Sequence, residues 1–119
     1  MNTRITGAWG EELAAKEYKR RKYKLLAMGY RSRFGEIDLI VQNKQYIVFS
    51  EVKLRKNDIF AAAREFVDAG KIERIRNTAE IWLSENETEL QPRFDVVEIY
   101  APDGVNTRNP LLNLIENAF

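Results

Sequence analysis

Apolar positions along the chain recur with two periods, and the longer period predicts helices at the beginning and in the middle. Across residues 7–24 apolar side chains mix with charged ones at helical spacing, and Thr6 is a candidate N-cap. A similar spacing runs through residues 68–85, with Lys and Arg on the opposite face. A short helical turn is expected just before this second helix, at residues 61–66.

Segments rich in β-branched and aromatic residues predict strands around these helices. Strands are predicted at residues 25–31, 36–41, 46–54, 94–100 and 111–115, and the enrichment is clear at residues 36–41, 46–54 and 94–100. The polar residues 42–45 between the second and third segments are typical of a hairpin connection. The order α-β-β-β-α-β-β predicts an α/β fold with a mixed central sheet of four to five strands flanked by helices, rather than a helix bundle or a β-sandwich.

The chain length and the missing residue types restrict the possible classes of protein. A length of 119 residues suits one domain, so residues 1–119 are expected to form a single unit. The sequence has no apolar run of membrane-spanning length and no secretory leader, which favours a cytoplasmic protein without membrane association. It also has no histidine and no cysteine. Serine–histidine catalysis, histidine-bound zinc and thiolate metal sites are therefore excluded, which leaves carboxylates, lysines, hydroxyls and hard, oxygen-bound metals.

The net charge of +1 conceals an uneven distribution. Residues 1–76 carry a net charge of +7 and residues 77–119 a net charge of −6. A basic first part suits a polyanionic partner, because neutralisation of phosphates dominates nucleic-acid affinity. A solvated helix face followed by an acidic tail would give the same distribution, so charge alone leaves both interpretations open.

Candidate chemistry lies in the predicted hairpin of residues 36–54. Side chains alternate along a strand, so Glu51 and Lys53 point to the same face. A four-residue loop would place Asp38 directly opposite Glu51, whereas a two-residue loop would place it one step along the diagonal. Either register brings Asp38, Glu51 and Lys53 to one face, where two carboxylates could share a cation.

The surroundings of these charges are strongly apolar, which is typical of interior strands. Paired carboxylates there would cost several kcal/mol unless a cation offset their repulsion. A Mg²⁺ ion would do so, because it accepts a few carboxylate oxygens together with waters and a substrate phosphate. Lys53 could orient a water or stabilise transition-state charge, and Glu11 could approach from the first helix. The alternative, an exposed edge strand with cross-strand ion pairs, remains open at this point.

Motifs spread over nearly the whole chain resemble one family. They are Gly10-Glu11 with Ala14, Arg31, GEIDLI at residues 35–40, FSEVKLR at residues 49–55, Lys71, Ala79, RFDVV at residues 93–97, and the terminal Asn117-Ala118-Phe119. In this order they resemble the YraN family, small uncharacterised bacterial proteins of the restriction-endonuclease-like fold. That fold is shared with Holliday junction resolvases and other PD-(D/E)xK nucleases.

The resemblance implies a role for each matching residue. Asp38 would be the motif acid, Glu51 the second metal ligand and Lys53 the motif lysine. Glu11 and the carbonyl of Val52 would complete a catalytic Mg²⁺ or Mn²⁺ site. The implied activity is hydrolysis of phosphodiesters in branched or otherwise structured DNA, or in RNA, with DNA preferred.

Two positions depart from the family pattern. Gly29 replaces the usual asparagine before the aromatic–Arg pair, and Ser50 replaces a valine beside Glu51. Neither departure removes a catalytic group.

Basic residues on either side of the predicted site in the sequence are candidate phosphate contacts. They are Arg31, Arg33, Arg55, Lys56 and Lys71. Lys71 could equally be an ordinary surface lysine, and Glu36 could be a spare ligand or a partner of Arg31 or Arg33.

A resolvase acts on two strands, so a homodimer is expected. A binding module for nucleic acid or protein that keeps this fold without turnover is the alternative function.

Overall fold

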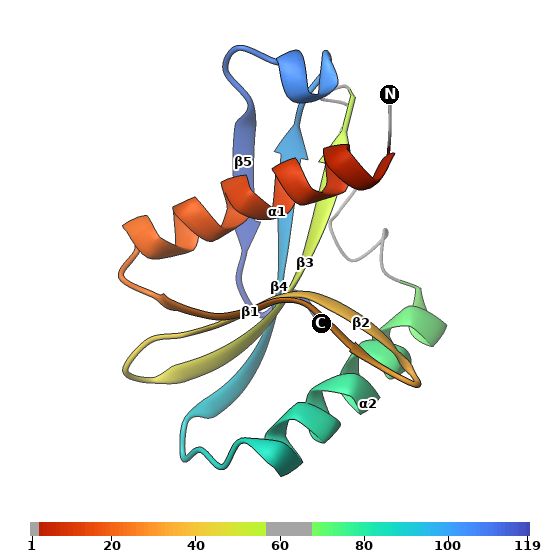
Figure 1. Ribbon diagram of the computed structural model, residues 1–119. Coiled ribbons are helices and arrows are strands. Elements are labelled where there is room, and N and C mark those ends of the chain that lie inside the picture. Colours follow the sequence, from red (N-terminus) through yellow and green to blue (C-terminus); the bar gives the residue numbers. More distant parts are fainter. Residues whose placement is uncertain (1–2, 57–67) are drawn as a thin grey trace.

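The computed structural model describes residues 3–56 and 68–119 (Figure 1). The elements, in chain order, are α1 (Thr3–Arg20), β1 (Lys24–Ser32), β2 (Gly35–Gln42), β3 (Tyr46–Arg55), α2 (Ala69–Glu85), β4 (Gln91–Tyr100), the 3₁₀ turn η2 (Gly104–Asn106) and β5 (Leu111–Ile115). This order confirms the predicted α/β fold. The helical turn expected at residues 61–66 lies outside the described residues.

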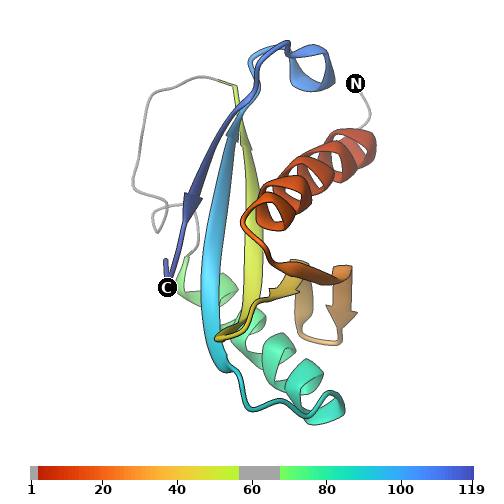
Figure 2. The same ribbon diagram turned by 90° about the vertical axis from the view of Figure 1, so that its left-hand side faces the viewer.

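Within the described residues, five strands form one mixed sheet in the order β1-β2-β3-β4-β5. Neighbouring strands are antiparallel except for β3 and β4, which are parallel and are connected through a segment that includes α2. β3 is therefore the central strand, as its apolar sequence on both faces indicates. The β1–β2 hairpin turns away from the direction of β3 to β5, so the sheet is strongly bent (Figures 1 and 2).

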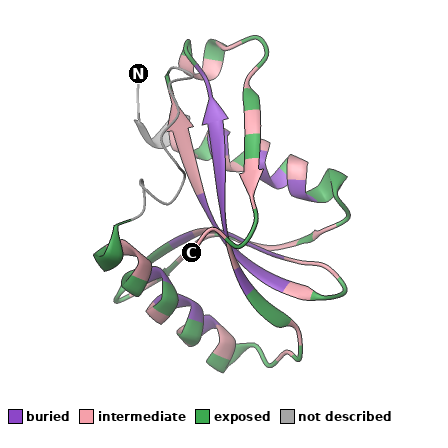
Figure 3. Cartoon of the chain, turned by 180° about the vertical axis from the view of Figure 1, so that it is seen from behind, coloured by how far each residue is buried: buried purple, intermediate pink, exposed green. Residues whose placement is uncertain are grey.

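The two helices cover opposite faces of the sheet (Figure 2). On one face α1 packs over Leu39, Val48 and Val97, and on the other α2 packs over Ile40 and Phe49. Burial is greatest along β4, which lies between β3 and β5 (Figure 3). No helix in the described part of the chain has the length and apolar character needed to cross a membrane.

The first helix begins and ends earlier than its hydrophobic pattern predicts. It starts at Thr3, so the prediction of Thr6 as its N-cap is wrong, and it ends at Arg20 rather than near Lys24. Lys22 adopts a φ of 72°, while the amides of Lys22 and Tyr23 donate to the carbonyls of Lys19 and Tyr18. This is the pairing of a Schellman C-cap. Glycine is the usual signal for such a cap, and its absence explains why the pattern gave no indication of the helix end.

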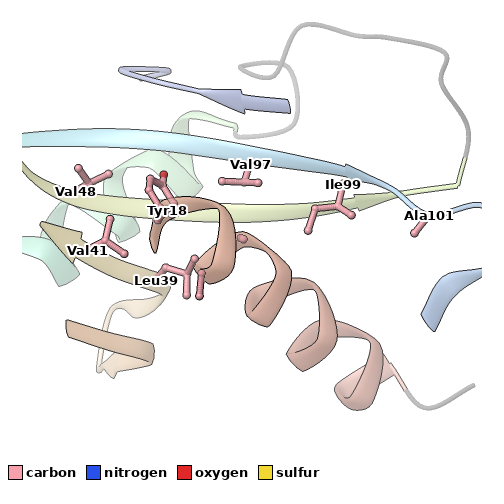
Figure 4. Packing of buried hydrophobic residues seen from close by; sticks show 9 residues of the cluster. Tyr18, Leu39, Val41, Val48, Val97, Ile99 and Ala101 are labelled. Atoms are coloured by element: carbon pink, nitrogen blue, oxygen red, sulfur yellow. The ribbon is translucent and has the colours of Figure 1, made fainter. Parts of the chain in front are cut away.

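A buried polar network connects α1 to the centre of the sheet. The Tyr18 hydroxyl is within hydrogen-bonding distance of Asp95 Oδ2 (2.8 Å) and Ser50 Oγ (2.9 Å), and Tyr18 is the aromatic side chain that reaches from the end of α1 towards β3 and β4 in Figure 4. Asp95 also accepts two hydrogen bonds from the Arg93 guanidinium and one from the amide of Asn117. Asp95 and its partner Tyr18 are fully buried. Every acceptor site on this carboxylate therefore contributes to joining α1, β3, β4 and the chain end.

We expect Tyr18→Phe to lower the free energy of unfolding by about 2 kcal/mol, because it leaves a buried carboxylate short of a donor. Urea denaturation followed by circular dichroism measures this. Tyr30→Phe is the matched control: Tyr30 also donates to a carboxylate, that of Glu85, but at the surface, and its loss should cost less than about 0.5 kcal/mol. Equal effects of the two substitutions would contradict a structural role for the buried network.

Candidate functional site

The register of the β2–β3 hairpin positions the first two site residues. Asn43 Oδ1 accepts hydrogen bonds from the amides of Gln45 and Tyr46, and this side chain fixes a four-residue loop in which Gln42 pairs with Ile47. Of the two registers that the sequence left open, the structure therefore has the one that places Asp38 opposite Glu51. Asparagine at the first loop position was a signal for this turn, because its side chain commonly bonds to amides two residues further on.

The site lies where β2 separates from β3. Their pairing ends at Leu39 and Ser50, after which residues 35–38 of β2 continue beside β1 and residues 51–55 of β3 continue beside β4. We call this opening the fork. Asp38 Oδ2 accepts a hydrogen bond of 2.8 Å from the amide of Val52, a donor that now has no ladder partner on β2. The Asp38 carboxylate thus takes the place of a β2 carbonyl as the acceptor for the Val52 amide. Without it, burying this amide would be costly.

Two lysines approach Glu51 from different elements. Lys71 Nζ, from the first turn of α2, lies 2.6 Å from Glu51 Oε1, and Lys53 Nζ lies 3.5 Å from the same oxygen. The Glu51 side chain is only 7% exposed, whereas Lys53 and Lys71 are 25% and 31% exposed. The prediction that these charges sit on an interior strand is confirmed, and the alternative of an exposed edge strand is wrong. The cations form the outer side of the site.

Crowding of carboxylates makes the fork electrostatically unfavourable in the absence of a further cation. Burial, followed by the nearby charge of Glu51, raises the pKa of Asp38 from 3.8 to about 7; the Val52 amide and Lys71 act in the opposite direction. Burial also raises the pKa of Glu11 on α1, with contributions from Glu36 and Glu51. The charge of Glu51 therefore acts on Glu11, and the role of Glu11 as a ligand stays a prediction of the resemblance. Burial is the largest cause of both shifts and the neighbouring carboxylates add to it, so the charged form of Asp38 is costly here.

The two lysines are affected differently by the same surroundings. Burial and the neighbouring Lys71 lower the pKa of Lys53, against the attraction of Glu51. Burial also disfavours the charged form of Lys71, but its short contact with Glu51 raises its pKa above the ordinary value. Lys71 is therefore the firmly charged partner of Glu51. The sequence predicted Lys71 as a phosphate contact or an ordinary surface lysine and did not foresee its contact with Glu51, because the sequence of a helix's first turn does not show what packs against it.

The remaining predicted basic residues lie at two ends of the fork. Arg31 and Arg33 are exposed at the β1–β2 turn, and Arg31 pairs with Glu36 at 3.5 Å, one of the two roles considered for that glutamate. Arg55 and Lys56 lie at the end of β3, with Arg55 half-buried and Lys56 exposed. Arg31 and Arg33 thus lie just before β2, and Arg55 and Lys56 lie at and just after the end of β3, so the four residues flank the strand segments that carry Asp38 and Glu51.

One buried acid near the site was not singled out from the sequence. Glu98 on β4 is in register with Lys53 of β3 and is only 2% exposed. It lies 3.2 Å from Asn113 Nδ2 and 3.5 Å from the Tyr100 hydroxyl. A glutamate within the apolar run of residues 94–100 was the available signal, since buried acids are uncommon without a role or a partner.

The donor set fits a cation that needs few protein ligands. Among the described residues no three acidic side chains are arranged as a ready-made metal cage. Mg²⁺ is commonly held by one or two carboxylates and completed by water and substrate phosphate, so the Asp38–Glu51 pair meets its requirement, with Glu11 nearby. Such an ion would offset both the burial of the Asp38 charge and its repulsion by Glu51.

Both departures from the family pattern have a structural explanation. Gly29 has a φ of 64°, a left-handed conformation that glycine and asparagine adopt more readily than other residues. Ser50 is buried and its hydroxyl pairs with the Tyr18 hydroxyl, so a polar residue here has a partner. Neither change alters the carboxylates or lysines at the fork.

We expect Asp38→Asn to stabilise the metal-free protein. A pKa raised to about 7 means that stability is lost as the pH rises from about 4 through 7, because the folded state must then carry an unfavourable charge. The rise in the pKa of Asp38 corresponds to about 4 kcal/mol of free energy of unfolding. We expect about half of this effect, because the Asp38 side chain is only half-buried and solvent screens part of its charge. Urea denaturation in EDTA should show the variant about 2 kcal/mol more stable near pH 8, and the difference should vanish towards pH 4.

The control for this substitution is Asp103→Asn, at an exposed aspartate. Its stability should differ from that of the wild type by less than about 0.5 kcal/mol at every pH. A loss of stability in Asp38→Asn near pH 8 would contradict the electrostatic description of the fork.

Comparison with known proteins assigns the family. The model of the uncharacterised protein family UPF0102 matches residues 10–99. A UPF0102 protein of Caldanaerobacter subterraneus is 37% identical, with all of this chain and 98% of the relative aligned. Those of Vibrio parahaemolyticus (45% identical, 84% of each chain) and Acetivibrio thermocellus (40%, with 99% of this chain and 93% of the relative) are similar over comparable lengths. The chain therefore belongs to the UPF0102 family, which is the YraN family that its motifs resemble.

Proposed function

We propose that this protein is a metal-dependent nuclease that hydrolyses phosphodiesters of branched or otherwise structured DNA, or of RNA. The observation that carries the proposal is the placement of Asp38 opposite Glu51 at the fork, with Lys53 and Lys71 on the same side. A carboxylate whose pKa is raised, as that of Asp38 is, in a partly buried place is typical of functional sites. The cation would be Mg²⁺ or Mn²⁺, held by Asp38 and Glu51 with Glu11 and the Val52 carbonyl as further ligands.

Asp38, Lys53 and Lys71 would each have a separate role in phosphodiester hydrolysis. A bound divalent cation would polarise the phosphodiester and lower the pKa of a bound water. Asp38 is held in place by the Val52 amide, so its free oxygen keeps a fixed direction without help from the substrate. Lys53 would stabilise the negative charge that develops on the phosphoryl oxygens. Lys71, which remains charged, would contact a neighbouring phosphate once Glu51 is occupied elsewhere.

The distribution of basic residues supports a nucleic-acid substrate. Arg31 lies near the end of β1 and Arg33 in the turn before β2, whereas Arg55 ends β3 and Lys56 follows it. A strand passing over the carboxylates would meet positive charge before and after them, which offsets its own phosphates. Cleavage of both strands of a junction needs two such sites, so the proposal includes a homodimer.

The rival function is a module that binds nucleic acid or protein without turnover. The contact of 2.6 Å between Lys71 and Glu51 favours it, because an internal ammonium already neutralises the second acid. In a domain that binds no cation, the Lys71–Glu51 ion pair would be enough to neutralise the second carboxylate. The two functions differ in whether a divalent ion enters the fork.

The first test is cleavage by the purified full chain of a panel of substrates with Mg²⁺, Mn²⁺ or EDTA. The panel contains linear duplex, single-stranded DNA, a four-way junction and RNA. We expect EDTA-sensitive cleavage of at least one substrate, reduced about a hundredfold or more in Asp38→Asn and Glu51→Gln, because each removes charge needed in the transition state.

The control is Glu12→Gln, an exposed acid on α1 next to Glu11, which should keep wild-type activity. Binding without cleavage by every preparation, unchanged by the two site variants, would establish the rival module instead.

The second test concerns metal affinity rather than turnover. The Lys71 ammonium competes with a cation for Glu51 Oε1, so Lys71→Met should bind Mn²⁺ about tenfold more tightly than the wild type, a change of about 1.4 kcal/mol. Isothermal titration calorimetry or the electron paramagnetic resonance signal of free Mn²⁺ measures this. Lys44→Met, at an exposed lysine in the β2–β3 loop, should leave the affinity unchanged. Equal affinities for all three proteins would show that no cation meets Glu51.

A further inference from the structure

The turn between β1 and β2 presents an aromatic side chain to solvent. We call residues 32–35 the hairpin tip. Phe34 is 37% exposed, and it is one of three large hydrophobic residues that are exposed in the described part of the chain, with Met28 and Leu111. It belongs to neither core cluster. Of these three, Phe34 has arginine directly before it in the chain, so its exposure is combined with positive charge.

The hairpin tip is held rigidly although it is exposed. The amide of Phe34 donates to Ser32 Oγ at 3.0 Å, and the same oxygen lies 2.8 Å from Thr78 Oγ1 on α2. A side chain at Gly35 would meet Arg74 Cβ at 3.4 Å, so the turn lies directly against α2, as Figure 1 shows. A ring on an anchored turn needs little ordering when a ligand binds, and this lowers the entropic cost of the contact.

One arginine lies on the ring, and two more lie close to the hairpin tip in the chain or on α2. The Arg33 guanidinium lies over it, with its central carbon 4.8 Å from the ring centroid. Arg74 is exposed on the adjacent turn of α2. Arg31 is also near in the chain, but Glu36 at 3.5 Å offsets part of its charge. An exposed aromatic ring among arginines matches a nucleotide, which offers a flat apolar face and a negative phosphate together.

The hairpin tip continues directly into the candidate site. Phe34 precedes Asp38 by four positions, which corresponds to roughly 13 Å along β2. A few nucleotides span this distance, since successive phosphates of one strand are at least about 3.4 Å apart. A strand whose phosphate lies at the fork would therefore pass beside the ring.

We propose that Phe34 stacks on an unpaired base of a nucleic-acid strand that runs from the hairpin tip to the fork. Arg33 and Arg74 contact the flanking phosphates. The ligand class is single-stranded nucleic acid, or the unpaired part of a branched one, because bases paired inside a duplex do not offer a free face to the ring. This inference rests on the proposed function and names which part of the substrate the protein recognises.

The test uses oligonucleotides that carry 2-aminopurine, whose fluorescence is quenched when an aromatic ring stacks on it. Wild type and Phe34→Ala are titrated, in Ca²⁺ or EDTA to prevent cleavage, with a single strand, a duplex with a single-stranded flap and a blunt duplex, each as DNA and as RNA. We expect Phe34→Ala to bind the strand and the flap about tenfold more weakly, with loss of quenching, and the blunt duplex as tightly as wild type does. Phe34→Trp should restore both the affinity and the quenching. The DNA and RNA series decide which sugar is preferred.

The matched control is Met28→Ala, because Met28 is 40% exposed on the same hairpin but has no arginine beside it. Its affinities should equal those of the wild type. Phe34 has a negative φ, since the positive values among described non-glycine residues are at Lys22 and Asn117, so alanine introduces no backbone strain. If wild type binds these oligonucleotides and Phe34→Ala binds them equally well, the stacking inference alone is overturned. If wild type binds none of them, the proposed function fails together with it.

Discussion

Mutual repulsion between Asp38 and Glu51 is the constraint on which the organisation of this site depends. Two carboxylates at the fork of β2 and β3 can be tolerated only if other groups supply positive potential. Three groups on two elements supply it: the Val52 amide and Lys53 on β3, and Lys71 on α2. The compensation is incomplete, because the pKa of Asp38 remains raised to about 7. A sheet that tolerates such strain at one place usually does so because the place is used.

The opposite face of the sheet shows how the same chain treats an acid with a purely structural role. Asp95 is fully buried, yet Arg93, Tyr18 and the Asn117 amide together satisfy its carboxylate. This network joins α1, β4 and the chain end, so the strands that hold the site cannot shift easily with respect to each other. One buried acid stabilises the scaffold, and the pair at the fork costs stability. The contrast supports assigning the chemistry to the fork and the rigidity to Asp95.

The chain has relatives of similar length in the UPF0102 family, but the description of this family names no activity. The functional argument therefore depends on the charges and their surroundings. In the proposed function, the fork and the hairpin tip act as one binding surface: carboxylates and lysines in the opening, and an anchored aromatic ring with Arg33 over it just before β2. Such a surface is suited to a strand that has both exposed phosphates and exposed bases.

Local patterns in the sequence were sufficient for the fold class, the element order and the sharing of one face by Asp38, Glu51 and Lys53, because hydrophobic period and strand alternation are properties of neighbouring residues. They were not sufficient for the end of α1, where Lys22 takes the left-handed position that glycine usually marks. The hairpin register was left open although Asn43 carried a local signal for it. Local patterns could not place Lys71 on Glu51 or pair Tyr18 with Asp95. Those contacts join residues distant in the chain, and only the packing of both helices against the bent sheet decides which distant side chains meet.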